Sequence, residues 1–132
     1  MDRLFLDANV LFSAAYRPAP GLLRLWKLPS VALCSSRYAL EEARANLSTE
    51  SQRSRLAELS GALELFESGG GKLPGGVSLP EKDAPILLAA VAAHATHLIT
   101  GDLRHFGPLF SKRIAGFIIL PPADYLRRTT SR

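Results

Sequence analysis

Four acidic side chains in this sequence stand where a strand is expected to end or a helix to begin. Asp7 and Asp102 each follow a short, mainly apolar run, and Asp83 precedes a long apolar segment. Glu42 lies within a helical pattern that follows another apolar run. Mg²⁺ and Mn²⁺ prefer oxygen ligands, and like charges in one pocket repel each other unless a cation lies among them. These positions therefore indicate a divalent-metal site, the chemistry by which nucleases activate water against a phosphodiester.

Apolar runs that alternate with helical patterns must position these acids, and the alternation predicts parallel β–α units in an α/β fold. In an open parallel sheet, ligands bind at the carboxyl ends of the strands, so Asp7 and Asp102 should project at one edge. A glycine-rich tract at 68–71 should stop the helix before it. Strands are expected at 3–6, 31–34, 97–100 and 116–120, and helices at 22–26, 37–47, 50–67, 83–94 and 121–126.

The other two acids are expected at the starts or on the faces of helices. Asp83 can cap its helix and still bind a metal, because both roles place the carboxylate at the helix start. Pro85 suits the first turn, where its missing N–H costs nothing. On a helical wheel of 37–47, Glu42 flanks the apolar side and Glu41 points further into solvent. The competing interpretation is that these acids are ordinary caps or solvated surface residues.

Size, charge and cysteine content limit the class of protein. The chain has 132 residues, which predicts one domain spanning 1–132. Its formal net charge of +4 suits a polyanionic partner such as nucleic acid. Cys34 is the single cysteine, so neither a disulfide framework nor a thiolate zinc cluster is expected. Together with a first segment unlike a signal peptide, this favours a cytoplasmic location.

The residues around the four acids resemble the PIN-domain family of metal-dependent ribonucleases, which includes the VapC-like toxins. The resemblance covers nearly the whole chain, and the order and spacing of its pieces are more specific than any piece alone. The matching segments are 6–11, 36–47, 83–90, 98–102, 105–107 and 118–126.

The resemblance implies an α/β/α sandwich of three layers with a central, mainly parallel sheet. It also implies a Mg²⁺- or Mn²⁺-dependent enzyme that hydrolyses RNA phosphodiester bonds. Many such proteins are toxins of type II toxin–antitoxin pairs, so a small antitoxin and a homodimer are implied as partners. The family's four catalytic, metal-binding acids match Asp7, Glu42, Asp83 and Asp102.

The resemblance assigns supporting roles to three more residues. Asn9 and Thr100 match polar family positions that orient carboxylates or contact substrate, although a turn residue and a strand residue are the simpler interpretations. Many members carry a further acid where this chain has Arg104. The number of metals, one or two, is therefore left open, and Arg104 is either a phosphate contact or an ordinary surface arginine.

Two other functional classes compete with a ribonuclease. The first is a PIN-fold module that is inactive or weakly active and binds RNA or protein. The second is a phosphotransferase of the haloacid-dehalogenase type, which also begins with an Asp after a strand. That class needs a second Asp two residues later, and Asn9 occupies this position. His105 could touch substrate, but packing against Phe106 in a turn is the favoured interpretation.

Overall fold

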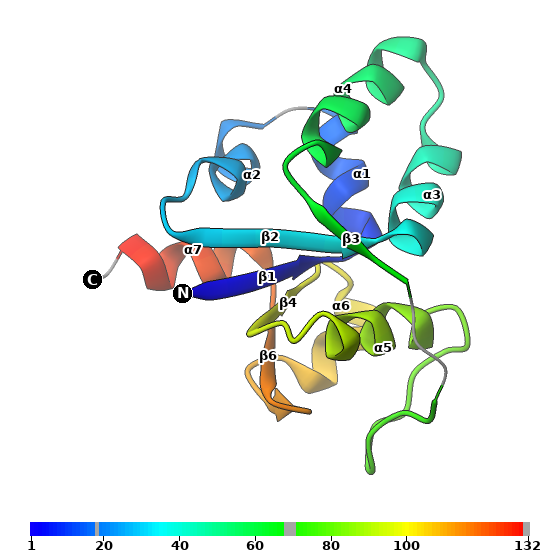
Figure 1. The fold of residues 1–132 in the computed structure, drawn as a ribbon, viewed down its shortest axis with the longest axis vertical. Coiled ribbons are helices and arrows are strands. Elements are labelled where there is room, and N and C mark those ends of the chain that lie inside the picture. Colours follow the sequence, from blue (N-terminus) through cyan, green and yellow to red (C-terminus); the bar gives the residue numbers. More distant parts are fainter. Residues whose placement is uncertain (18, 68–70, 131–132) are drawn as a thin grey trace.

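A six-stranded sheet in the order β3-β2-β1-β4-β6-β5 forms the centre of the protein (Figure 1). The computed structural model describes residues 1–17, 19–67 and 71–130. All neighbouring strands run parallel except β5, which is antiparallel to β6. The strands are β1 (Asp2–Leu6), β2 (Val31–Ser36), β3 (Glu64–Phe66), β4 (His97–Ile99), β5 (Arg113–Ile114) and β6 (Phe117–Leu120).

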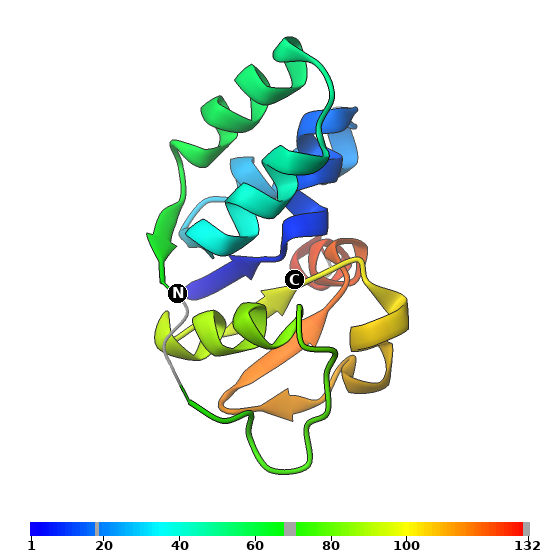
Figure 2. The same ribbon diagram turned by 90° about the vertical axis from the view of Figure 1, so that its right-hand side faces the viewer.

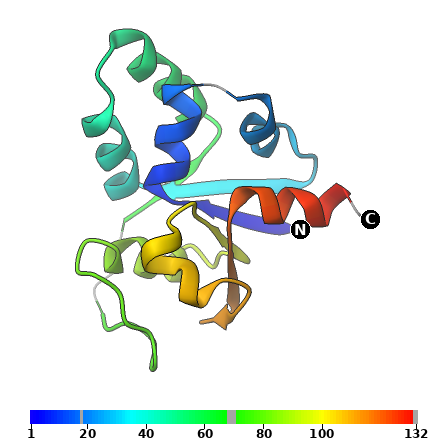
Figure 3. The ribbon, with the colours of Figure 1, turned by 180° about the vertical axis from the view of Figure 1, so that it is seen from behind.

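Helices cover both sides of this sheet, so the expected three-layer arrangement is confirmed. Figure 1 shows α1 to α4 gathered on one side of β1 and β2, with α5 on the other; Figure 2 shows the same layers turned by 90°. Seen from behind, α7 runs beside α2 (Figure 3). The α-helices are α1 (Ala8–Tyr16), α2 (Pro20–Leu23), α3 (Arg37–Asn46), α4 (Glu50–Ser60), α5 (Ala84–Ala92), α6 (Leu103–Phe106) and α7 (Pro122–Thr130), and short 3₁₀ turns cover Arg24–Lys27 and Gly107–Leu109.

The carboxyl halves of the central strands β1 and β4 are apolar and buried, as expected where helices cover both faces of a sheet. Leu4, Phe5 and Leu6 of β1 are fully buried, as are Leu98 and Ile99 of β4. Burial of side chains of this size is the main favourable contribution to folding, at roughly 1.5 to 3 kcal/mol each. The middle of the sheet is therefore a rigid support for the residues that follow the strands at its carboxyl edge.

Strand register brings distant parts of the chain to one level at the carboxyl edge. Leu6 lies opposite Ile99, and Ile99 lies opposite Leu120. The next residues continue the pairing, since the Asp7 N–H donates to the Ile99 carbonyl at 3.0 Å and the Thr100 N–H donates to the Leu120 carbonyl at 3.1 Å. Asp7 and Thr100 therefore leave the sheet side by side.

The prediction of one helix was wrong in its C-terminal part. The helix expected at 50–67 ends at Ser60, and Glu64–Phe66 forms β3 instead. The leucine and phenylalanine spacing fits a helix locally, but β2 offers a free edge whose backbone groups pair with this segment. Residues 68–70 of the expected glycine stop lie outside the described residues. Among the described residues, no helix is long and apolar enough to cross a membrane.

Removing the cap of α3 should destabilise the protein measurably. The Ser36 hydroxyl accepts a hydrogen bond from the Ala39 N–H at 3.0 Å at the start of the helix that carries Glu42. We expect Ser36→Ala to lower the free energy of unfolding by about 0.5 to 2 kcal/mol. Urea denaturation measures this, with the exposed Ser48→Ala as control. Equal effects of the two substitutions would contradict the capping role.

Candidate active site

Asp7 is a buried carboxylate at the junction of β1 and α1. Asp7 as a whole is only 4% exposed to solvent. Oδ1 accepts from the Ala8 N–H at 2.6 Å, and Oδ2 accepts from the Thr100 hydroxyl at 2.7 Å and from the Asn9 amide at 3.1 Å. Burial raises the pKa of Asp7 to about 6, despite the hydrogen bonds that lower it, and the charges of Asp83 and Glu42 add to the rise.

Asn9 and Thr100 join the ends of β1 and β4. The Asn9 carbonyl oxygen accepts from the Gly101 N–H at 2.8 Å, and the Thr100 hydroxyl accepts from the Asp102 N–H at 3.1 Å. A Cβ atom at Gly101 would lie 3.4 Å from the same Asn9 oxygen, so the backbone approaches this side chain closely. Asn9 and Thr100 therefore form a hydrogen-bonded link between the Asp7 carboxylate and the backbone at Gly101 and Asp102.

Asp83 occupies the N-cap position of α5, but its side chain makes no capping hydrogen bond. The expectation of a side-chain cap was therefore wrong. Pro85 has no N–H to offer, and the Ile86 N–H donates to the backbone carbonyl of Asp83 instead. Asp83 Oδ2 is buried and has no hydrogen-bond partner. Its close polar neighbour is His105 Nδ1, which lies 2.8 Å away, within ion-pair distance.

His105 lies between two of the acids. Its Nδ1 atom is 2.8 Å from Asp83 Oδ2 and 2.9 Å from Asp102 Oδ2, and the contact with Asp102 has hydrogen-bond geometry. The His105 N–H also donates to Asp102 Oδ1 at 3.1 Å, so Asp102 caps α6. Sequence reasoning favoured simple packing for this histidine. Its spacing of three residues after a capping acid was the signal that could have revealed the contact.

The four acids line one cleft of about 650 Å³, together with Asn9 and Lys82. Glu42 faces this cleft, whereas Glu41 lines a different hollow beside Arg44 and Arg53. Within the described part of the chain, the groups whose ligand atoms all lie within 4.8 Å of one another are those of Asp83, Asp102 and His105. Asp83 and Asp102 therefore belong both to the cleft wall and to this tight group of three, whereas His105 is not among the residues that line the cleft.

Desolvation makes negative charge costly in this cleft. Burial raises the pKa of Glu42, and the charge of Asp83 raises it further while Lys82 lowers it. Burial also raises the pKa of Asp83; His105 and Lys82 oppose this rise, and Asp102 adds to it. Sequence reasoning did not find Lys82, which lies next to Asp83 in the chain and is the cation on the cleft wall.

The structure separates the remaining candidate residues from the cleft. Arg104 is exposed and is absent from the residues that line it. Arg53 and Arg55 also lie outside its lining, and their guanidinium groups donate to the carbonyls of Leu47 and Ala15. These two arginines stabilise the packing of α4 against its neighbours.

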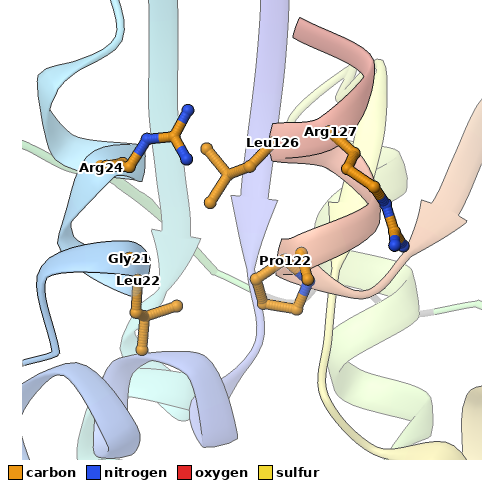
Figure 4. Close-up of a pocket in the computed structure, with 7 residues that line it drawn as sticks. Gly21, Leu22, Arg24, Pro122, Leu126 and Arg127 are labelled. Carbon is orange, nitrogen blue, oxygen red and sulfur yellow. The ribbon is translucent and has the colours of Figure 1, made fainter. Parts of the chain in front are cut away.

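A second hollow, of about 370 Å³, lies between α2 and α7 (Figure 4). Leu22, Pro122 and Leu126 contribute apolar surface to it, and Arg24 and Arg127 lie at its margin. None of the described residues that line it carries a carboxylate. The acid-lined cleft is therefore the candidate active site.

Fold and cleft together define a PIN-type α/β protein, and comparison with known families agrees. The PIN domain family matches residues 3–104, so the chain belongs to this family. A search of curated proteins finds no match.

Several solved structures share the fold at low sequence identity. VapBC2 from Rickettsia felis, bound to a promoter DNA fragment, matches with a TM-score of 0.70 and 19% identity, over 90% of this chain and 98% of that one. VapBC-1 from nontypeable Haemophilus influenzae matches with a TM-score of 0.60 and 14% identity, over 91% and 98%. FitAcB from Neisseria gonorrhoeae matches with a TM-score of 0.54 and 20% identity, over 90% and 97%.

The raised pKa of Asp7 predicts a pH-dependent loss of stability in metal-free protein. The folded state retains this proton up to about pH 6, whereas the ordinary value is 3.8. The stabilising contribution is thus complete below pH 3.8 and is lost as the pH rises through 6. Relative to wild type, we expect Asp7→Asn to gain on the order of 2 kcal/mol between pH 4 and pH 7.5.

Urea denaturation in EDTA at several pH values measures this gain. Glu41→Gln, a change at an exposed acid on α3, should follow wild type at every pH. Parallel stability curves for Asp7→Asn and wild type would show that the Asp7 carboxylate carries no such penalty.

Proposed function

We propose that this protein is a metal-dependent endoribonuclease that hydrolyses RNA phosphodiester bonds. The observation that carries the proposal is a single cleft lined by Asp7, Glu42, Asp83 and Asp102, in which the buried Asp83 Oδ2 accepts no hydrogen bond. Membership of the PIN domain family, whose members are generally nucleases, supports the same activity. The four acids are the proposed catalytic residues.

The residues of the cleft fit a divalent cation. Three of its carboxyl groups have raised pKa values, so in the metal-free protein negative charge there is unfavourable. A cation among the carboxylates would remove this penalty and would satisfy Asp83 Oδ2. We propose that Asp83 and Asp102 hold Mg²⁺ or Mn²⁺, with Asp7 and Glu42 as further ligands. When bound, the ion would supply Lewis-acid chemistry that activates water and neutralises charge on the phosphate.

The chain itself supplies orientation and charge for this reaction. Thr100 and Asn9 hold the Asp7 carboxylate in one orientation, which lowers the entropic cost of assembling the site. Lys82 on the cleft wall places a positive charge where an RNA phosphate would approach. The net charge of +4 favours the encounter with RNA at low ionic strength.

We further propose that the protein is the toxin of a type II toxin–antitoxin pair and works in the cytoplasm as a homodimer. The solved structures of the same fold come from two-component assemblies named VapBC and FitAB, which supports a small protein partner. The chain spans 98% and 97% of the matching chains in two of them, so its length is that of the comparable component.

Loss of one acid should remove RNA cleavage without unfolding the protein. We expect Asp102→Asn to lower the rate of Mn²⁺-dependent cleavage of a mixed RNA panel by roughly 10²-fold or more, because it removes a ligand and a charge. Gel analysis of fluorescently labelled RNA measures the rate, and circular dichroism checks the fold. Glu41→Gln should cleave like wild type.

Two outcomes would count against the enzyme. Cleavage that survives in a purified Asp7→Asn/Asp102→Asn double variant would show that these acids do not carry the reaction. RNA binding by wild type without cleavage, across the panel and with either metal, would favour a binding module of the same fold.

The proposed toxin role predicts a growth phenotype. We expect induced expression of the wild-type chain in a bacterial host to stop growth, since cleaved RNA would halt protein synthesis. Asp102→Asn, expressed to the same level, should permit growth. In cells that express the wild-type chain, co-expression of a small protein encoded next to this gene should restore growth. Equal growth arrest by wild type and Asp102→Asn would show that toxicity does not depend on the proposed catalytic acid, and would contradict the proposed role.

A further inference from the structure

We infer that His105 is a nitrogen ligand of the metal site, beside Asp83 and Asp102, and that the site therefore takes a transition ion such as Mn²⁺ in preference to Mg²⁺. The inference rests on the proposed metal-dependent function for the presence of an ion. To the four proposed acidic ligands the inference adds a nitrogen ligand, and it adds a preference for Mn²⁺ over Mg²⁺.

Two of the three distances between the ligand atoms are close to those that an ion requires, and all three atoms lie within 4.8 Å of one another. His105 Nδ1 lies 2.8 Å from Asp83 Oδ2 and 2.9 Å from Asp102 Oδ2. Two neighbouring ligands of an octahedral ion with bonds of about 2.1 Å lie about 3.0 Å apart. An ion can thus bind among the three atoms with a small adjustment of side-chain torsions.

Hydrogen bonding alone leaves this group incomplete. A histidine Nδ1 atom carries at most one hydrogen, so it can donate to Asp102 or to Asp83 but not fully to both. The hydrogen bond goes to Asp102, and Asp83 Oδ2 stays buried without a partner. A cation bound by Asp83, Asp102 and Nδ1 would satisfy all three groups at once.

The contact between Nδ1 and Asp102 Oδ2 orients the imidazole, and the backbone that carries the ring is also held. The His105 N–H donates to Asp102 Oδ1, and the next residue, Phe106, is fully buried. The His105 side chain is 23% exposed and that of Asp83 is 10% exposed. Little conformational entropy therefore remains to be lost when the ring binds an ion.

The mixture of ligand types sets the preference between cations. Mg²⁺ binds oxygen ligands and retains several waters, whereas imidazole nitrogen favours the transition ions. A site of oxygen ligands alone would discriminate little between Mg²⁺ and Mn²⁺. One nitrogen ligand shifts the balance toward Mn²⁺.

A spectroscopic test distinguishes a ligand from a residue that only positions Asp102. Pulsed electron paramagnetic resonance of wild type with Mn²⁺ should show modulation from one directly bound ¹⁴N nucleus. His105→Gln should lose this signal, while His94→Asn should keep it, because His94 is exposed and lies at the opposite end of α5. A histidine that acts only through a hydrogen bond would give no direct nitrogen coupling.

Calorimetric titration with each metal alone gives the second measurement. We expect His105→Gln to weaken Mn²⁺ binding by about tenfold or more and to change Mg²⁺ binding far less. Absence of nitrogen coupling in wild type, or its persistence in His105→Gln, would overturn the inference. Should His105→Gln fail to fold, His105→Asn and wild type labelled with ¹⁵N-histidine would give the same decision.

These experiments test the role of His105 as a metal ligand separately from the proposed ribonuclease activity. Nitrogen coupling without RNA cleavage would support His105 as a ligand while the proposed ribonuclease fails. Cleavage that depends on the acids, in the absence of nitrogen coupling, would support the ribonuclease and reject the nitrogen ligand.

Discussion

The bond between the Thr100 hydroxyl and the Asp7 carboxylate, at 2.7 Å, joins the two central strands at the edge where the site lies. Strand register places these residues side by side, and the apolar interior of β1 and β4 makes that register rigid. The pair also positions its neighbours, because the Asn9 amide donates to Asp7 and the Asp102 N–H donates to Thr100. A buried acid is thereby placed where desolvation makes its charge costly.

That cost is the link between stability and the proposed activity. Buried carboxylates that repel one another destabilise a protein, and a protein retains them where a function offsets the cost. The cost in this cleft is electrostatic. It shows in the raised pKa values of Asp7 and Asp83 and in one buried Asp83 oxygen that accepts no hydrogen bond. A bound cation is the simplest way to relieve both, which is why the metal-free and metal-bound proteins should differ in stability as well as in activity.

The larger elements were predictable because their signals are local. Alternating apolar runs and helical patterns indicated β1, β2, β4 and β6 and the helices between them. β3 was missed because its side chains fit a helical pattern, and only the free edge of β2 makes a strand the better solution. The preference for Glu42 over Glu41 followed from the wheel of one helix, and the two residues do face different hollows.

The sequence by itself determined which acids are present, their order, and the strand or helix to which each belongs, because these depend on neighbours close in the chain. Only the tertiary structure decided which ligand atoms meet. Asp83 and His105 are 22 positions apart, and the distance between them depends on how α5 and α6 are seated against the sheet. The absence of a side-chain cap from Asp83 is likewise a local detail of one helix start, where Pro85 has no N–H and the Ile86 N–H bonds to the Asp83 backbone carbonyl. Contacts of this kind depend on loop geometry and packing to within an ångström, which residue spacing does not specify.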